Sequence, residues 1–225
     1  MQVHRLSLGQ VSAYLVETPQ GVILIDAGMP HREKTVIQKL HRIGRFDLRL
    51  IYITHAHPDH YGSAAALKKL TGAPVAIHTL DSDAMMRGET QLGEARGQGK
   101  LIQWLFPLIS VLVRPTPLKS DILFEGGERL DEFGLAGQIL HTPGHTDGSS
   151  SLWLEEGILF AGDLVSSTGK PHIQRAFAQN WSLIPESLQR LRDLKPRWIY
   201  PGHGARPLSQ REFLELGVNR RNKGG

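Results

Sequence analysis

Four side chains that can bind a transition metal lie within six residues, in the run His55-Ala-His-Pro-Asp-His60. This run follows the apolar, β-rich segment Leu48 to Thr54, so it leaves the end of a predicted strand. If it does so as a loop, His55 and His57 can converge on one ion while Asp59 and His60 turn toward a second. A catalytic zinc ion usually takes three protein ligands and keeps one position open, so further ligands must come from elsewhere in the chain.

Three more candidate ligands each follow a predicted strand. His145 comes after a Pro-Gly pair that favours a tight turn, and Asp163 comes after Gly162. His203 lies in the run Pro-Gly-His-Gly204, again just after a strand. Since the three share this strand-to-loop context, we expect them to join the first cluster at one metal centre.

Composition excludes several other chemistries. Cysteine is absent from the 225 residues, so disulfides and thiolate metal sites are excluded. The net charge of +4 is modest and the basic residues are mostly scattered, which gives no support for nucleic-acid binding. Residues 1–10 lack the pattern of a secretory leader, so a cytoplasmic location is expected. No Gly-x-Ser-x-Gly motif supports a serine nucleophile.

Alternating strands and helices must position these ligands. A hairpin is predicted over 13–26, and helical spacing over 33–43 precedes the strand at 48–54. Helix-forming sequence then covers 62–70 and strand-forming sequence 74–79. The second half has strand candidates at 136–140, 150–154, 158–160 and 198–200, and an amphipathic helix at 185–194. We expect one domain over 1–225, with a variable apolar insert around 81–121.

The insert contains the apolar run Leu101 to Val113, which is too short and too interrupted to span a bilayer. It is either a lid that gives the active site an apolar substrate pocket, or a buried helix or homodimer contact. Under the first interpretation Trp104 and Phe106 contact substrate. Lys170 and His172, which follow Asp163 in the chain, are further candidates for lining the substrate mouth.

The order His-x-His-x-Asp-His, Thr-Pro-Gly-His-Thr, Gly-Asp and Pro-Gly-His-Gly resembles the metallo-β-lactamase superfamily. Ile25-Asp26-Ala27-Gly28 resembles its first motif, whose acid supports the metal ligands from behind, and His141 is a second candidate for that supporting role. The resemblance implies an α/β fold of the four-layer αββα sandwich type, with a dimetal site at one edge between the two sheets.

The resemblance also implies the ligand assignment. His55, His57 and His145 would bind one ion, Asp59, His60 and His203 the other, and Asp163 would bridge them. Asp59 and Asp163 are the expected catalytic carboxylates. Two Zn²⁺ ions are expected, with iron or manganese as alternatives because His and Asp donors accept all three. A hydroxide held between the metals would attack a carbonyl.

The predicted activity is hydrolysis of an ester, thioester or lactone in a small molecule with an apolar or acyl portion. Glyoxalase II-type thioesterases usually carry a C-terminal helical extension with basic residues, whereas only about twenty residues follow His203 here. Quorum-quenching lactonases commonly place a Tyr shortly after the bridging Asp, and none follows Asp163 closely. These features weaken both assignments without excluding them. The alternatives are β-lactam hydrolysis as a side activity, an iron-dependent persulfide dioxygenase, and a non-catalytic binding protein stabilised by metal.

Overall fold

The apolar segments of the first half pair into a six-stranded sheet with the order β1-β2-β3-β4-β5-β7. The computed structural model describes residues 1–217, apart from the side chains of residues 109, 111 and 112. The first three strands are antiparallel neighbours, whereas β3, β4, β5 and β7 run parallel. Parallel strands end at the same edge of a sheet. The six are β1 (Gln2–Ser7), β2 (Ser12–Thr18), β3 (Gly21–Ile25), β4 (Leu48–Tyr52), β5 (Val75–His78) and β7 (Ile122–Phe124).

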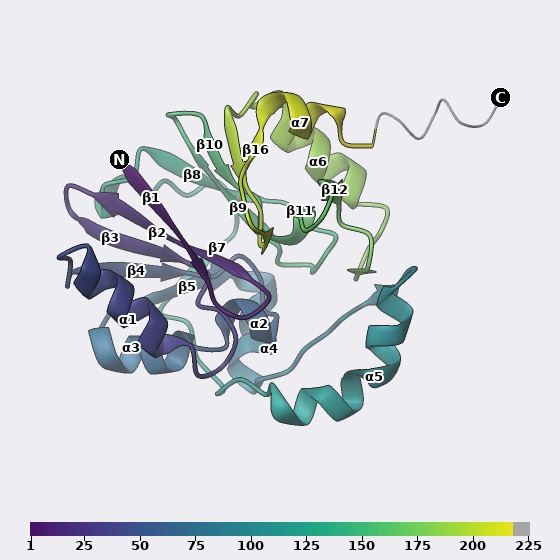
Figure 1. The fold of residues 1–225 in the computed structure, drawn as a ribbon, viewed down its shortest axis with the longest axis horizontal. Coiled ribbons are helices and arrows are strands. Elements are labelled where there is room, and N and C mark those ends of the chain that lie inside the picture. The colour runs from purple at the N-terminus through teal and green to yellow at the C-terminus, as the bar shows by residue number, and fades with distance from the viewer. Residues whose placement is uncertain (218–225) are drawn as a thin grey trace.

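The second half forms a five-stranded sheet with the order β16-β14-β10-β9-β8. Strand β10 pairs parallel with β14 and antiparallel with β9. Figure 1 shows this sheet against the first one. The strands are β8 (Gly137–His141), β9 (Ser150–Leu154), β10 (Ile158–Phe160), β14 (Trp198–Tyr200) and β16 (Leu208–Ser209).

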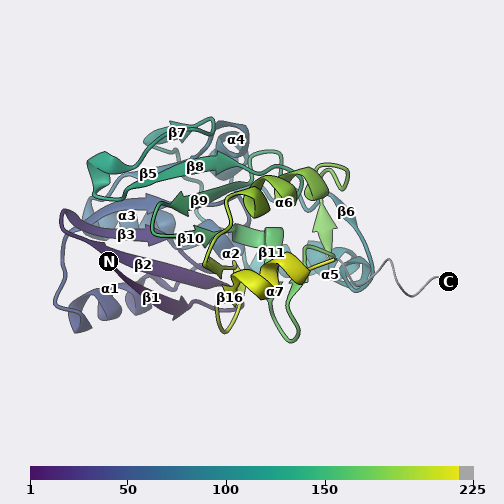
Figure 2. The same cartoon turned by 90° about the horizontal axis from the view of Figure 1, so that it is seen from above.

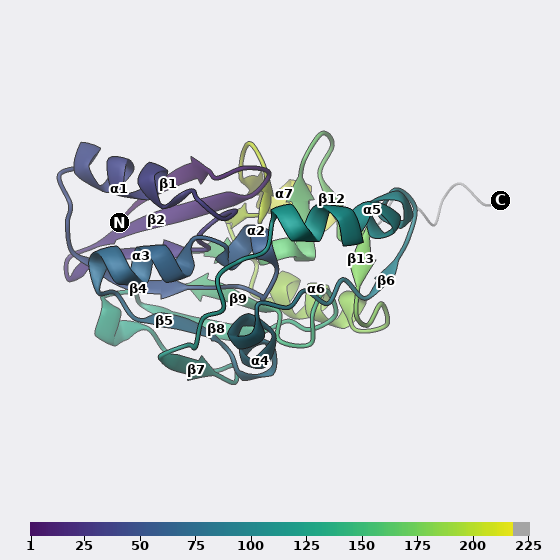
Figure 3. The same ribbon diagram turned by 90° about the horizontal axis from the view of Figure 1, so that it is seen from below.

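Three apolar layers hold the sheets and helices together. Buried aromatic side chains, including Tyr14, Tyr52 and Phe160, fill the space between the two sheets. Helices α1 (Glu33–Arg42), α3 (Ala64–Thr71) and α4 (Thr79–Arg87) pack on the outside of the first sheet (Figure 3). Helices α6 (Ile184–Asp193) and α7 (Gln210–Glu215) cover the second (Figure 2). The protein is therefore the predicted four-layer αββα sandwich.

Shorter elements lie at the edge where the parallel strands end. Strand β11 (Val165–Ser167) pairs with β12 (His172–Ile173) and β15 (His203–Gly204), and β6 (Glu94–Ala95) pairs with β13 (Phe177–Ala178). The predicted insert contains α4, β6 and the long helix α5 (Gly99–Leu112). Across residues 1–217, none of the helices has the length and apolar character needed to cross a membrane. That residues 1–225 form a single domain stays a prediction.

Candidate metal centre

The His55 to His60 run follows β4 and enters one turn of helix, α2 (Pro58–Tyr61), so Asp59 and His60 lie on a helical turn and not on a loop. Pro58 occupies the first helical position, where its fixed φ fits and its missing N–H costs no hydrogen bond. The helical turn is short, but it separates the ligands. His55 and His57 precede it, whereas Asp59 and His60 lie on it and face a different group of donors.

His55, His57 and His145 form the first group of donors. His57 Nδ1 lies 3.1 Å from His55 Nε2 and 3.0 Å from His145 Nε2. Three nitrogens converge here, and all three side chains are at least 94% buried, with exposures of 1%, 6% and 3%. Two nitrogens bound tetrahedrally to one zinc ion lie about 3.4 Å apart, so the spacing suits a common ion.

Asp59, His60 and His203 form a second group, within 4.8 Å of one another. His203 Nε2 lies 3.4 Å from Asp59 Oδ2. Asp163 lies between the groups: its Oδ1 is 3.3 Å from His60 Nε2, and its Oδ2 is 3.1 Å from His203 Nε2 and 3.5 Å from His145 Nε2. The structure thus brings all seven predicted donors together, with one carboxylate shared.

Segments far apart in the chain supply these donors through the strand ends. Asp163 lies on the 3₁₀ turn Gly162–Leu164 after β10, and His203 follows β14, the parallel neighbour of β10. Gly202 allows the close approach, because a Cβ there would lie 2.3 Å from Asp163 Oδ1 and 2.9 Å from His60 Cε1. The sheet topology therefore delivers Asp163 and His203 to the same place.

The ring nitrogen that points away from the centre is hydrogen-bonded in every one of the five histidines. Such bonds fix the ring orientation and leave the inward nitrogen with its lone pair free to bind a metal. The contacts are His55 Nδ1 with Thr54 Oγ1 at 3.0 Å, His57 Nε2 with the Gln91 carbonyl at 3.3 Å, His60 Nδ1 with Asp26 Oδ2 at 2.8 Å, His145 Nδ1 with the Phe177 carbonyl at 3.0 Å, and His203 Nδ1 with the Gln10 carbonyl at 2.9 Å.

Asp26 supports the centre from the end of β3. Its backbone has a φ of 58°, a left-handed conformation that Asp tolerates better than most residues. The buried carboxylate accepts hydrogen bonds from the Thr54 backbone N–H at 2.9 Å and from the Thr54 hydroxyl, besides its contact with His60. Asp26 therefore positions both the start of the ligand run and one of its rings.

Asp81, on α4, connects the segment that carries His55 and His57 to the loop that carries His145. The sequence analysis did not identify this residue. Its buried carboxylate accepts hydrogen bonds from the Ala56 backbone N–H at 2.7 Å, the Thr146 hydroxyl at 2.8 Å and the Gly148 backbone N–H at 2.8 Å. Ala56 lies between two ligands and Thr146 follows a third. Two of the three partners are backbone groups, so no sequence motif indicates this role.

Burial favours the neutral form of two imidazoles in the first group, those of His55 and His145. It lowers the pKa of His145 to about 4, with neighbouring imidazoles adding to the effect, and it holds the pKa of His55 well below its usual range. Neutral imidazole is the form that binds metal. These imidazoles are therefore suited to binding a metal cation.

Carboxylates dominate the second group. Burial opposes the protonation of His203, but Asp163 outweighs it and raises the pKa of His203 to about 9. The pKa of His60 is raised well above its usual value, because Asp26, Asp163 and Asp59 together outweigh burial. Without a metal, protonated rings supply the positive charge that these acids require.

Two inward atoms lack any hydrogen-bond partner among the described residues. They are His60 Nε2 and Asp163 Oδ1, both buried and both directed into the centre. A buried polar atom without a partner is costly, and a bound cation would satisfy both. The donor set, its spacing and these atoms fit divalent metal ions.

The remaining predicted site residues lie around the centre rather than in it. His141 stacks on His78 and its Nε2 lies 2.7 Å from the Asp147 carbonyl, so it braces the His145 loop without contacting a ligand ring. Lys170 is exposed, and His172 is half-buried with its Nδ1 2.9 Å from the Lys170 carbonyl. Trp104 is 76% exposed and is not part of the lining of the cavity described next.

A cavity of about 640 Å³ opens beside α2. Its lining includes Pro58, Gln91, Phe106, Val113 and Arg114. Pro58 adjoins the ligand Asp59 in the chain, and the Gln91 carbonyl contacts His57. The cavity therefore lies between α5 and residues that adjoin the candidate metal centre, with Phe106 on its apolar side.

The family model described as "Metallo-beta-lactamase superfamily" matches residues 6–203. This chain belongs to the metallo-beta-lactamase superfamily. Its curated relatives include the uncharacterised protein YobT of Bacillus subtilis, 33% identical over 97% of this chain and 93% of the relative. The probable metallo-hydrolase YflN of the same organism is 29% identical over 94% of this chain and 86% of that protein.

Other superfamily members match with different coverage. A hydroxyacylglutathione hydrolase of Pseudomonas aeruginosa is 32% identical over 63% of this chain but only 41% of its own length. The crystal structure of TTHA1623 in a di-iron-bound form superposes with a TM-score of 0.70 at 25% identity, over 96% of this chain and 98% of that one. As a metallo-beta-lactamase superfamily member with this donor set, the protein is a metal-dependent hydrolase.

Proposed function

We propose that this enzyme hydrolyses an ester, thioester or lactone whose apolar portion occupies the cavity beside Phe106. The observation that carries the proposal is the convergence of seven donors next to a cavity with an apolar wall. The relatives named hydroxyacylglutathione hydrolase support including thioesters. The nucleophile that attacks the carbonyl carbon would be water, since the chain supplies neither a serine elbow nor a cysteine.

Two zinc ions are the proposed metals. His55, His57 and His145 would hold one, Asp59, His60 and His203 the other, and Asp163 would be shared between them. When bound, such ions polarise a carbonyl oxygen and bring the pKa of water toward neutrality. TTHA1623, a structural neighbour with bound iron, makes iron the alternative to test.

The chain's own residues would orient the substrate and move the proton. Asp59 has the most exposed side chain among the acidic donors, at 27% against 9% for Asp163. A carboxylate oxygen of Asp59 can therefore take a proton from the attacking water and release it to solvent. Phe106, Val113 and Pro58 would exclude water from the apolar portion of the substrate.

Metal content is measured first, on protein loaded separately with Zn²⁺, Fe²⁺ and Mn²⁺. Each preparation is then assayed with acyl esters of increasing chain length, acyl thioesters and lactones. We expect about two ions per chain and turnover of at least one class. No turnover of any of the three with any metal, together with cleavage of a β-lactam or oxidation of a persulfide, would contradict the proposal.

Phe106→Ala tests the substrate pocket. Because Phe106 is expected to bind the acyl chain and not the reacting carbonyl, KM for long-chain substrates should rise about tenfold while kcat changes little. Phe46→Ala, at a residue 73% exposed and absent from the cavity lining, is the matched control. Equal effects of Phe106→Ala on short and long substrates would remove Phe106 from the pocket.

A further inference from the structure

Helix α5 is apolar on two opposite faces. At 100° per residue, Phe106, Ser110 and Val113 point to one side, and these residues line the cavity beside the metal centre. On the other side lie Leu101, Trp104 and Leu108, a set we call the α5 stripe. An apolar helix face is normally buried, so the second face calls for an occupant.

The α5 stripe is unusually exposed. Leu101, Trp104 and Leu108 are 62%, 76% and 74% exposed. Figure 1 shows α5 at the lower right margin, outside the two sheets and their covering helices. Adjacent exposed apolar residues of this size mark an interaction surface.

The charges around α5 indicate which kind of partner would cover the α5 stripe. From Arg96 to Ser120 the chain carries four basic residues, Arg96, Lys100, Arg114 and Lys119, and no acidic one. Among residues 1–217, Lys100 and Arg114 make no ion pair with an acid, while the nearby Glu89 and Glu94 are each paired with an arginine. The segment that carries the α5 stripe is therefore positively charged.

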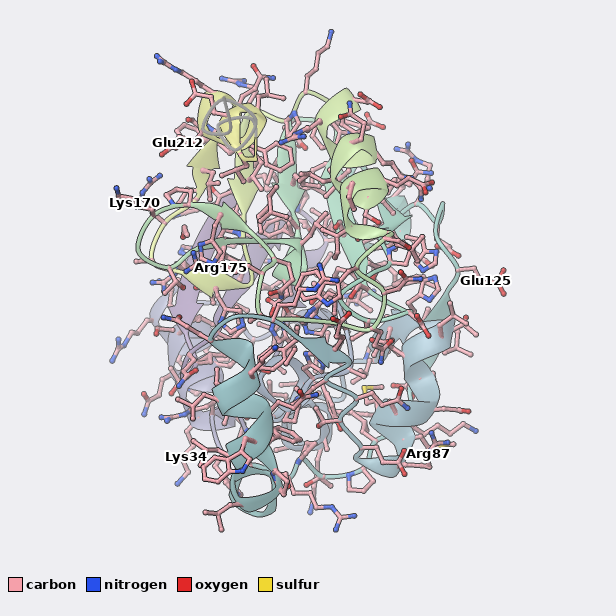
Figure 4. All side chains as sticks on the ribbon, turned by 90° about the vertical axis from the view of Figure 1, so that its right-hand side faces the viewer. Lys34, Arg87, Glu125, Lys170, Arg175 and Glu212 are labelled. Carbon is pink, nitrogen blue, oxygen red and sulfur yellow. The ribbon has the colours of Figure 1, made fainter. Side chains whose placement is uncertain are left out.

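The positive surface continues beyond α5. Arg175 is exposed and follows Gln174, which contacts the ligand His145. In Figure 4, Lys170 and Arg175 are carried by the loop drawn above α5, on the side of the molecule that faces the viewer. The backbones meet closely, because a Cβ at Gly99 would lie 2.2 Å from the Ala176 carbonyl oxygen. The start of α5 and the Arg175 loop thus form one surface.

We propose that α5 docks this protein on an anionic lipid surface. The α5 stripe would enter the region between headgroups and acyl chains, and Lys100, Arg114 and Arg175 would lie among the anionic headgroups. A second copy of the chain fits less well, because its α5 would bring the same positive charges against these. The proposal goes beyond the hydrolytic function and stands without it, since lipid binding requires no turnover.

Vesicle flotation tests the docking. The metal-loaded protein is mixed with vesicles of phosphatidylcholine, with and without phosphatidylglycerol, and the bound fraction is measured. We expect binding only to the anionic vesicles, a decrease with salt, and a blue shift in tryptophan emission that Trp104→Phe removes. Lys100→Gln with Arg114→Gln should weaken binding about fivefold for each charge removed.

Two double variants separate the α5 stripe from general surface hydrophobicity. Trp104→Ser with Leu108→Ser should weaken vesicle binding about tenfold or more. Leu80→Ser with Leu123→Ser removes apolar side chains that are 59% and 51% exposed on α4 and β7, and binding should not change. Equal losses in the two double variants would overturn the proposal. So would absence of binding to anionic vesicles, or a dimer in sedimentation velocity that only the Trp104/Leu108 variant dissociates.

Discussion

Asp26 and His60 form a fully enclosed acid–imidazole pair, with Asp26 Oδ2 2.8 Å from His60 Nδ1. The opposite nitrogen of the same ring points into the candidate metal centre, 3.3 Å from Asp163 Oδ1 but without a hydrogen bond among the described residues. One imidazole thus links the carboxylate behind it to the ion expected in front of it. The negative charge of Asp26 makes the His60 ring a better electron-pair donor to a metal ion.

Asp26→Asn should weaken metal binding by about 10- to 100-fold, because the side chain keeps its shape but loses its charge. Asn also tolerates the left-handed backbone at this position. Competition with a chelator measures the affinity. Asp47→Asn, which removes an exposed acid paired with Arg45, is the control. Unchanged metal affinity in Asp26→Asn would show that the charge has no role.

Asp81→Asn should destabilise the protein by about 1–3 kcal/mol and loosen the first ligand group. The new amide N–H₂ would face donors on one side or the other, because both carboxylate oxygens accept hydrogen bonds. Urea unfolding gives the stability, and elemental analysis gives the metal content, which should fall toward one ion per chain.

The control for Asp81 is Asp121→Asn, because Asp121 also accepts a backbone hydrogen bond, from Val75 at 2.8 Å, but lies outside the three candidate ligand groups. The Asp121→Asn variant should be less stable than the wild type and should keep both metal ions. If Asp81→Asn behaves in the same way, Asp81 acts only on stability.

Gly202→Ala should lower activity about 100-fold by displacing Asp163 and His60. The added methyl would meet the Asp163 carboxylate directly. Activity and metal content are compared with those of Gly44→Ala, at a position with a φ of 69° and open space around it. The control should suffer backbone strain alone. Wild-type activity in Gly202→Ala would mean that the Asp163 position is not critical.

We expect the contribution of Glu212 to the stability of the protein to depend on pH. Hydrogen bonds from Arg206 and from the Ser209 backbone lower the pKa of Glu212 to about 2. A depressed carboxyl pKa contributes stability above the unfolded value of 4.5, and that contribution is lost as pH falls through about 2. Since the side chain is 35% exposed, we expect less than about 1 kcal/mol.

The measurement is urea unfolding of the wild type and Glu212→Gln at neutral pH and at about pH 3. The variant should be less stable at neutral pH, and the difference should shrink in acid. A difference that stays constant with pH would show that the Glu212 charge adds nothing.

Sequence patterns predicted most long elements of this fold. The hairpin over 13–26 corresponds to β2 and β3, and the helical spacing at 33–43 to α1. The mixed polar sequence of β1 gave no signal, because an edge strand that is largely exposed does not need alternating apolar residues. Helix α2 has only four residues, too few for a periodic pattern.

The candidate site was also only partly predictable from the sequence. Its seven donors were found because each has a ligating side chain beside a predicted strand end, and the structure brings them together; their binding of metal stays a proposal. Asp81 could not be found, because its role depends on backbone N–H groups that only the folded loops bring to it. The orientation of Trp104 depends on how α5 lies against its neighbours.

Asp163 and His203 follow strands of the second sheet, β10 and β14, and this has a consequence for biosynthesis. The ribosome makes the His55 to His60 run early, so the nascent chain exposes four donors long before β10 and β14 exist. The first donor group lacks its last imidazole until His145 is made, and the second lacks its own until His203 is made in β15. Tight metal capture should therefore be a late event, and an ion taken up then would lock the two halves of the newborn protein to each other.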